Sequence, residues 1–204
     1  MKKLVTLLLL FSSAVKAASL EDVIKDMRQY DQQKLINALS IKRYKLIEGE
    51  GKSEHFLQVC GNNQLFSFTL EMVARELIRA VIITPNLTCK TDNPAFQHKE
   101  YLGLYIGQDE NDAKKVLGSN VKVYKKLHSH GEESFSFDYY MVKSEFIEID
   151  LTTKEGFEVL IKEGVFSPDV EQSPVELADK YTSTTAFVEN KKVNRITFSS
   201  GFSF

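Results

Sequence analysis

The stretch HFLQVCGNNQLFSFTLEM, residues 55–72, decides the fold class of this chain. Phe66, Phe68 and Leu70 alternate with polar residues in its second half, and residues 55–60 follow a similar period. Alternation with a period of two predicts strands with one buried face, and the Gly-Asn-Asn-Gln tetrapeptide at 61–64 predicts a turn. The stretch is therefore predicted to be two strands joined by a tight turn.

Further runs with a period of two extend this sheet in both directions along the chain. The expected strands lie at about 43–47, 101–106, 182–188 and 193–198, with a meander over 121–161. The secondary structure of residues 73–83 is left open, because their apolar spacing fits a helix and their second half fits a buried strand equally well. The segment 85–94, which carries Cys89, is expected to be a loop.

Two helices are predicted, each with a capping residue at its start. Ser19 caps the first, whose apolar residues follow a period of 3.6 as far as Leu39. Asp109 caps a two-turn helix within 107–118, and Gly118 ends it. The predicted fold class is α+β: an N-terminal helix and a short central helix packed on a mostly antiparallel, meandering sheet.

The N-terminus has the order of a cleaved secretory signal peptide. Lys2 and Lys3 precede an apolar run from Leu4 to Phe11, and small residues follow up to Ala17. The run is shorter than the roughly 20 residues that span a bilayer, and no later run comes closer. We therefore expect cleavage near Ala17 and a single exported domain, 18–204, in the periplasm or outside the cell, without stable membrane insertion.

Cys60 and Cys89 are the only cysteines of the chain. In an oxidising compartment such a pair predicts a disulfide, which for a loop of about 30 residues contributes roughly 3–4 kcal/mol to stability. The alternative, a reactive Cys60 assisted by His55, would leave Cys89 without a role. A structural bridge is the expectation.

The charge balance bears on the class of partner. Residues 1–17 hold three basic residues and no acidic one, so the exported domain would carry 23 basic and 28 acidic residues. This acidic balance argues against nucleic acid or an anionic membrane as the partner. The sequence also lacks the hydrolase-elbow, zinc-protease, phosphate-loop and dinucleotide signatures, so we expect no cofactor and favour a protein-binding role over catalysis.

A hairpin predicted over 134–151 contains the strongest candidate for an acidic functional site. Its hydrophobic register would gather Asp138, Glu148 and Asp150 on one face, where they would form a cation site or an acid/base pair. The preceding strand would bring two lysines to the same face, which would then be an ordinary salt-bridged, solvated surface. The same register turns Tyr140 and Phe146 outward as a candidate partner-binding surface.

Two other features carry alternatives. His128 and His130 have metal-like spacing, since alternate positions of a strand put two imidazoles on one side, but the segment also fits a polar hairpin loop. At the C-terminus, Ile196, Phe198 and Phe202 fall on one parity and the chain ends on Phe204, which resembles the last strand of outer-membrane barrels.

Residues 107–118, with the later meander and the Lys-Lys-Val-Asn-Arg-Ile strand at 191–196, resemble a pattern of small bacterial envelope proteins. These are the β-lactamase-inhibitor-protein-like domains and the small lipoprotein of the outer-membrane assembly machinery. Gln108, Asp109 and Ala113 replace the usual Met, hydroxyl residue and Val of that pattern. The resemblance implies a helix-plus-sheet module that binds another protein.

The expectation is therefore an exported, non-catalytic binding or accessory protein of the envelope or exterior, inhibitor-like or assembly-related. A small hydrolase or metal-binding protein built on the acidic or histidine candidates is the first alternative. A small outer-membrane barrel is the second.

Overall fold

A computed structural model describes residues 18–49, 54–71, 77–91, 93–125, 137–163, 165–167, 169–170 and 175–204. In this part of the chain, four α-helices accompany an eight-stranded antiparallel sheet, so the predicted α+β class is confirmed and the sheet dominates. No helix among these residues is long and apolar enough to cross a membrane. The predicted signal peptide, 1–17, lies outside the described residues.

The hairpin predicted at 55–72 is present. Strands β2 (Glu54–Gly61) and β3 (Gln64–Glu71) pair antiparallel from Glu54 opposite Glu71 to Gly61 opposite Gln64. Asn62 and Asn63 make the turn with positive φ angles of 39° and 60°. Asparagine tolerates this left-handed backbone, and two such residues in succession match the twist of the flanking strands.

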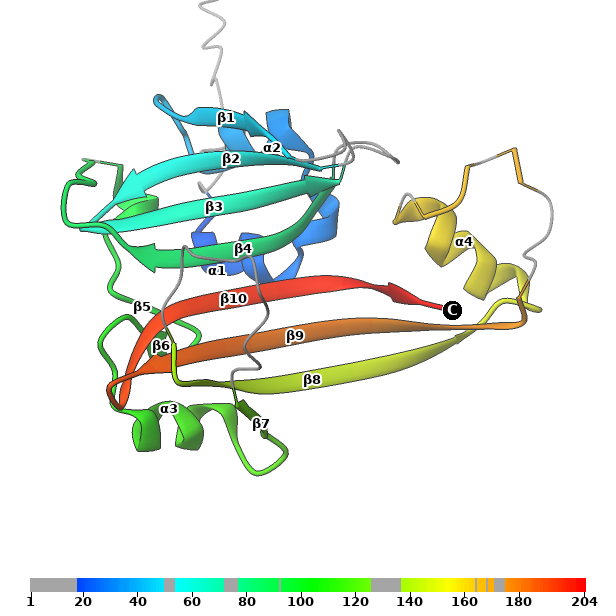
Figure 1. Cartoon of the computed structure of the whole chain (residues 1–204). Coiled ribbons are helices and arrows are strands. Elements are labelled where there is room, and N and C mark those ends of the chain that lie inside the picture. Colours follow the sequence, from blue (N-terminus) through cyan, green and yellow to red (C-terminus); the bar gives the residue numbers. More distant parts are fainter. Residues whose placement is uncertain are drawn as a thin grey trace, which may run out of the picture.

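The sheet consists of two four-stranded meanders that meet at their last strands (Figure 1). The first runs from β1 (Lys45–Glu48) through β2 and β3 to β4 (Leu77–Pro85), so that the strand interpretation of 77–83 is the correct one. The second consists of the strands β7 (Lys122–Lys125), β8 (Tyr139–Asp150), β9 (Leu177–Glu189) and β10 (Lys192–Ser203). A separate two-stranded pair, β5 (Glu100–Tyr101) and β6 (Leu104–Tyr105), lies between them in sequence.

Pairing between β4 and β10 joins the two meanders. Ile83 lies opposite Ile196 and Val81 opposite Phe198, and all four side chains are buried. They belong to one core that extends from the N-terminal helices to the central helix. Burial of this apolar surface is the main driving force that holds the two halves together.

The N-terminal helical segment is divided into three parts, whereas the sequence pattern predicts one continuous helix. α1 (Leu20–Lys25) starts at Ser19 with the predicted cap, and η1 (Met27–Gln29) and α2 (Gln32–Ala38) follow. The break between η1 and α2 has a tertiary cause: the carbonyl of Tyr30 accepts a hydrogen bond from the Ile78 amide of β4 at 2.9 Å. Helical spacing continues across this break, so periodicity alone does not reveal it.

The central helix α3 (Glu110–Leu117) forms as predicted. The Asp109 carboxylate accepts a hydrogen bond from the Asn111 amide, and Gly118 ends the helix with a φ of 89°. The Glu110 amide donates to the Lys191 carbonyl at 3.1 Å, which docks the start of the helix on the β9–β10 turn.

Residues 121–161 differ from the predicted meander in two ways. β8 is one uninterrupted strand that pairs with β9 from Tyr139 to Asp150, so the hairpin predicted over 134–151 is wrong. Its middle, around Ser144, has no Gly, Pro or Asn to favour a turn, and β9 offers backbone partners along its whole length. Residues Lys154–Lys162 form a helix, α4, which Thr153 caps through the Gly156 amide.

The helices cover one face of the sheet (Figure 1). Met141 and Ala186 lie in the core beneath α1–α3, while Ile149 and Ala178, on the same parity of β8 and β9, lie beneath α4. Successive side chains of a strand point to opposite faces, so the residues between these face away from the helices. We call that side the outer face; no described helix packs on it.

Candidate functional site

The predicted disulfide between Cys60 and Cys89 is present, with a Cα–Cα distance of 4.7 Å. It ties the end of β2 to the loop after β4, and the Asn63 amide donates a hydrogen bond to the Cys89 carbonyl at 2.9 Å. Because both sulfur atoms are bonded to each other, the alternative of a reactive Cys60 thiol is excluded in this state.

An aromatic row crosses the outer face of the second meander. Tyr124 of β7 lies directly opposite Tyr140 of β8, which lies opposite Phe187 of β9, which lies opposite Arg195 of β10. The Tyr124 and Tyr140 rings stack with centroids 5.2 Å apart, and the Tyr140 and Phe187 centroids are 5.5 Å apart. The Arg195 guanidinium lies 4.7 Å from the centroid of Phe187. Tyr124, Tyr140, Phe187 and Arg195 are referred to below as the aromatic row.

Phe137 consolidates the aromatic row from the side. Its ring meets Phe187 edge-on with centroids 5.1 Å apart and Tyr140 edge-on at 6.0 Å. Edge-to-face pairs and cation–π contacts each add to the energy of simple burial. Strand register therefore holds the rings in fixed relative positions, while Tyr124 at the sheet edge keeps 42% of its surface exposed.

A second aromatic pair lies farther along the same face. Phe146 lies opposite Tyr181, with ring centroids 6.4 Å apart, and Phe146 is 62% exposed. Gly201 of β10 lies beneath Tyr181, since a Cβ at this glycine would lie 2.6 Å from the Tyr181 hydroxyl oxygen. The outward direction predicted for Tyr140 and Phe146 thus agrees with the structure, although the predicted hairpin does not.

The structure separates Asp138 from the other two residues of the predicted acidic face, Glu148 and Asp150, which remain two positions apart on one face of β8. Asp138 and Glu148 lie at opposite ends of one extended strand, about 30 Å apart at the usual rise per residue. The Asp138 carboxylate accepts from the Asn190 amide at 2.8 Å, and the Asp150 carboxylate accepts from Thr152, whose hydrogen bonds lower the pKa of Asp150. Two of the three carboxylates thus support turns.

His128 and His130 lie outside the described residues. Within the described part of the chain, no cluster of three or more His, Cys, Asp or Glu side chains has the arrangement of a metal site.

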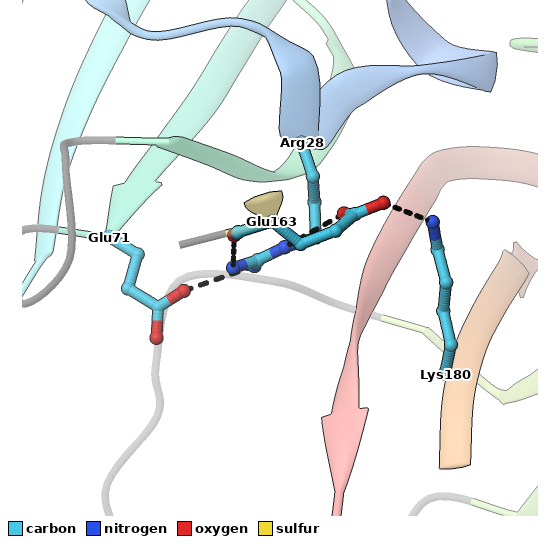
Figure 2. A network of polar contacts seen from close by, with 4 residues as sticks. All are labelled: Arg28, Glu71, Glu163 and Lys180. Atoms are coloured by element: carbon cyan, nitrogen blue, oxygen red, sulfur yellow. Dashed lines mark hydrogen bonds and ion pairs between the residues drawn. The ribbon is translucent and has the colours of Figure 1, made fainter. Parts of the chain in front are cut away.

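A partly buried network of four charges lies where the two meanders and α4 meet, and Figure 2 shows it from close by. The Arg28 guanidinium contacts a Glu71 carboxylate oxygen at 3.1 Å and donates to the Glu163 carbonyl at 3.1 Å. The Glu163 carboxylate lies 3.7 Å from Arg28 Nε and accepts from Lys180 Nζ at 2.6 Å. Each charge faces an opposite one, which is the arrangement of a structural clamp.

The central helix is also tied to β8 by a polar contact. The Tyr139 hydroxyl donates a hydrogen bond to the Glu110 carboxylate. Burial, followed by this hydrogen bond and the nearby negative charge, raises the pKa of Tyr139 to about 12. The contact fixes α3 to the N-terminal end of β8, next to Tyr140 of the aromatic row.

Phe187 and Arg195 were not identified from the sequence as site residues. Their strands were predicted, but the register between β8 and β9 was not, so nothing placed either residue beside Tyr140. One signal in the sequence points to Phe187. Thr185 and Glu189 share its face of the strand, so the alternation places an aromatic ring on the polar, outward side.

A scan against protein-family models finds no match for this chain, and searches of curated proteins and of solved structures find none either.

Proposed function

We propose that this chain is an exported, non-catalytic binding or accessory protein of the bacterial envelope or exterior, inhibitor-like or assembly-related. The observation that carries the proposal is the aromatic row on the outer face of the second meander. Its partner is another protein, which would dock across β7–β10.

The composition of this surface favours protein recognition. Tyr, Phe and Arg are enriched at the centres of protein interfaces, where large rigid side chains contribute most of the binding energy. Here neighbouring rings already fix one another, so little side-chain entropy remains to be lost on association. Between the aromatic row and Phe146 lie small hydroxyl side chains, among them Ser144 and Ser183, whose hydroxyl oxygens are 3.3 Å apart. Such groups supply adaptable hydrogen bonds to a partner.

Export rests on the predicted signal peptide, and the disulfide between Cys60 and Cys89 fits an oxidising compartment. Intact mass and fractionation test this part. The expected species lacks residues 1–17, leaves with the soluble fraction, and gains only the mass of the hydrogens that reduction adds. A full-length species held in the membrane fraction would contradict export as a free domain.

The binding surface is tested by site-specific photo-crosslinking in cells. A photoreactive residue placed at Tyr124 or at Phe146 should yield the same adduct, because both side chains are exposed on the outer face. The matched position is Val159 on α4, which is 37% exposed on the opposite side of the sheet and should yield no such adduct. Adducts from Val159 alone, or from none of the three positions, would contradict the proposed surface.

Affinity measurements with the identified partner follow. Tyr124→Ala and Phe146→Ala should each weaken binding by about tenfold, the effect of losing one aromatic anchor. Val159→Ala should leave the dissociation constant unchanged.

A further inference from the structure

A concave feature lies in the first meander, in the other half of the sheet from the aromatic row. It is a cleft of about 950 Å³ beside the disulfide. Its floor consists of β2 and β3 residues and the Cys60–Cys89 bridge. One wall is the segment 40–45 before and into β1, and the other wall is formed by residues 86, 88–91, 93 and 94 after β4. We call it the basic cleft.

Hydrogen bonds join the walls of the basic cleft. The Asn93 side-chain amide donates to the Leu39 carbonyl at 2.9 Å and to the Ser40 carbonyl at 3.1 Å. The Asn86 amide donates to the Asn63 carbonyl of the β2–β3 turn at 2.8 Å, which fixes the second wall to the floor. Together with the disulfide, these contacts hold the cleft open in one shape, which reduces the ordering that a ligand would have to impose.

The charged residues among the described lining residues of the cleft are all basic. Lys42, Arg43 and Lys45 lie on one wall and Lys90 on the other, and no acidic side chain is among the described lining residues. All four side chains are exposed, and none of them forms an ion pair within the described residues. This local excess of positive charge contrasts with the formal net charge of −2 for the chain.

The neutral groups of the cleft narrow the class of ligand. The lining also includes amide and hydroxyl side chains, among them Gln58, Thr88 and Thr91, which suit a ligand rich in hydroxyl groups. Tyr44, with 46% of its surface exposed, offers a ring face on which a sugar ring can stack. A volume of about 950 Å³ exceeds what a single small anion needs and lies at the upper end of the usual range for ligand pockets.

We propose that the basic cleft binds an acidic oligosaccharide, with carboxylate or sulfate groups on the two basic walls and a sugar ring against Tyr44. Cations on opposite walls suit a ligand whose negative charges are spaced along a chain. The site is independent of the aromatic row, so either proposal can fail while the other holds.

Calorimetric titration of the purified chain with defined oligosaccharides tests this proposal. An oligogalacturonate hexamer and a sulfated hexasaccharide are the acidic probes, maltohexaose is the neutral control, and inorganic phosphate is the single-anion control. At least one acidic probe should bind, with affinity falling about tenfold or more between about 50 and about 300 mM NaCl because salt screens exposed charges. Maltohexaose and phosphate should not bind measurably.

Variants locate the binding in the cleft. Arg43→Ala combined with Lys90→Ala removes one cation from each wall and should weaken acidic-probe binding by about tenfold. The matched pair, Lys122→Ala with Lys125→Ala, removes two exposed cations from β7 at the other edge of the sheet and should leave affinity unchanged. Equal urea midpoints of both variants and the parent chain show that folding is preserved.

Four results would overturn the proposal. The first three are failure of both acidic probes to bind, equal binding of maltohexaose, and an equal loss of affinity in the β7 pair. Competition by inorganic phosphate at the same concentration as the acidic probe would identify a single-anion site and likewise reject an oligosaccharide ligand.

Discussion

Replacing Arg28 by methionine should destabilise the junction between the two meanders and α4. The loss in the free energy of unfolding should exceed that of any single surface substitution. The Arg28 side chain is 6% exposed and makes hydrogen-bonded contacts to Glu71 and to the Glu163 carbonyl (Figure 2). Removing one partner of a buried ion pair costs about 3–5 kcal/mol, because the remaining charge stays buried without compensation.

Two features of the structure place Arg28→Met at the lower end of this range. Glu71 is 33% exposed, so water can solvate its carboxylate, and Lys180 continues to neutralise Glu163 from 2.6 Å. Methionine also retains an apolar stem beside Phe202, whose ring centroid lies 5.5 Å from the guanidinium carbon. We therefore expect a loss of about 3 kcal/mol in the free energy of unfolding.

Urea unfolding followed by far-ultraviolet circular dichroism measures this loss. Glu163→Gln and the double variant complete a cycle, and the loss in the double variant should be smaller than the sum of the single losses, since both charges of the pair are then absent. Lys154→Met is the matched control, because Lys154 pairs with Glu158 on the surface with its side chain 84% exposed. Its loss should stay below about 0.5 kcal/mol.

The reasoning would be refuted if Arg28→Met lost less than about 1 kcal/mol, or no more than Lys154→Met. Either outcome would mean that the four charges contribute little net stability and that apolar packing alone holds α4 in place.

Three further predictions concern the fold. Replacing Cys60 and Cys89 together by serine should lower the free energy of unfolding by about 3.6 kcal/mol, since the bridge spans a separation of 29 residues; a loss in urea unfolding below about 1 kcal/mol would contradict the loop-closure argument. Gly61→Ala should lower it by about 1–3 kcal/mol, because the new methyl would lie 2.4 Å from the Cβ of Phe96; an unchanged thermal midpoint would refute this. The pKa of Tyr139 is about 12 in the folded chain and 10.0 ordinarily, so between these pH values the unfolded chain releases a proton that the folded chain keeps, and stability should fall with rising pH. Tyr139→Phe should show a shallower fall in urea midpoints over this window, and identical slopes would count against the shift.

Local sequence signals identified the elements whose contacts are close in the chain. The β2–β3 hairpin follows from alternation on both sides of two asparagines, and α3 follows from Asp109 and Gly118. Each depends on interactions within a few residues, so the pattern contains the necessary information. The pairing of Cys60 with Cys89 also followed, because the chain has no other cysteine.

Predictions failed where a distant segment competes with the local pattern. The helix predicted from Ser19 to Leu39 is interrupted between η1 and α2, where the Tyr30 carbonyl accepts a hydrogen bond from Ile78 in a strand that the sequence left ambiguous. The hairpin expected within 134–151 is absent because β9 pairs with the whole of β8. Asp138 is therefore far from Glu148 and Asp150, with which the hairpin would have grouped it.

The sequence by itself determined the α+β class, the turn at 61–64, the disulfide partners and the capped central helix, since these depend on neighbouring residues or on there being one choice. Only the tertiary structure decided the β4–β10 seam, the register that aligns Tyr124, Tyr140, Phe187 and Arg195, and the approach of Lys90 to residues 40–45. Pairing of distant strands depends on burial of a shared core, and no periodicity within one segment specifies which other segment completes it.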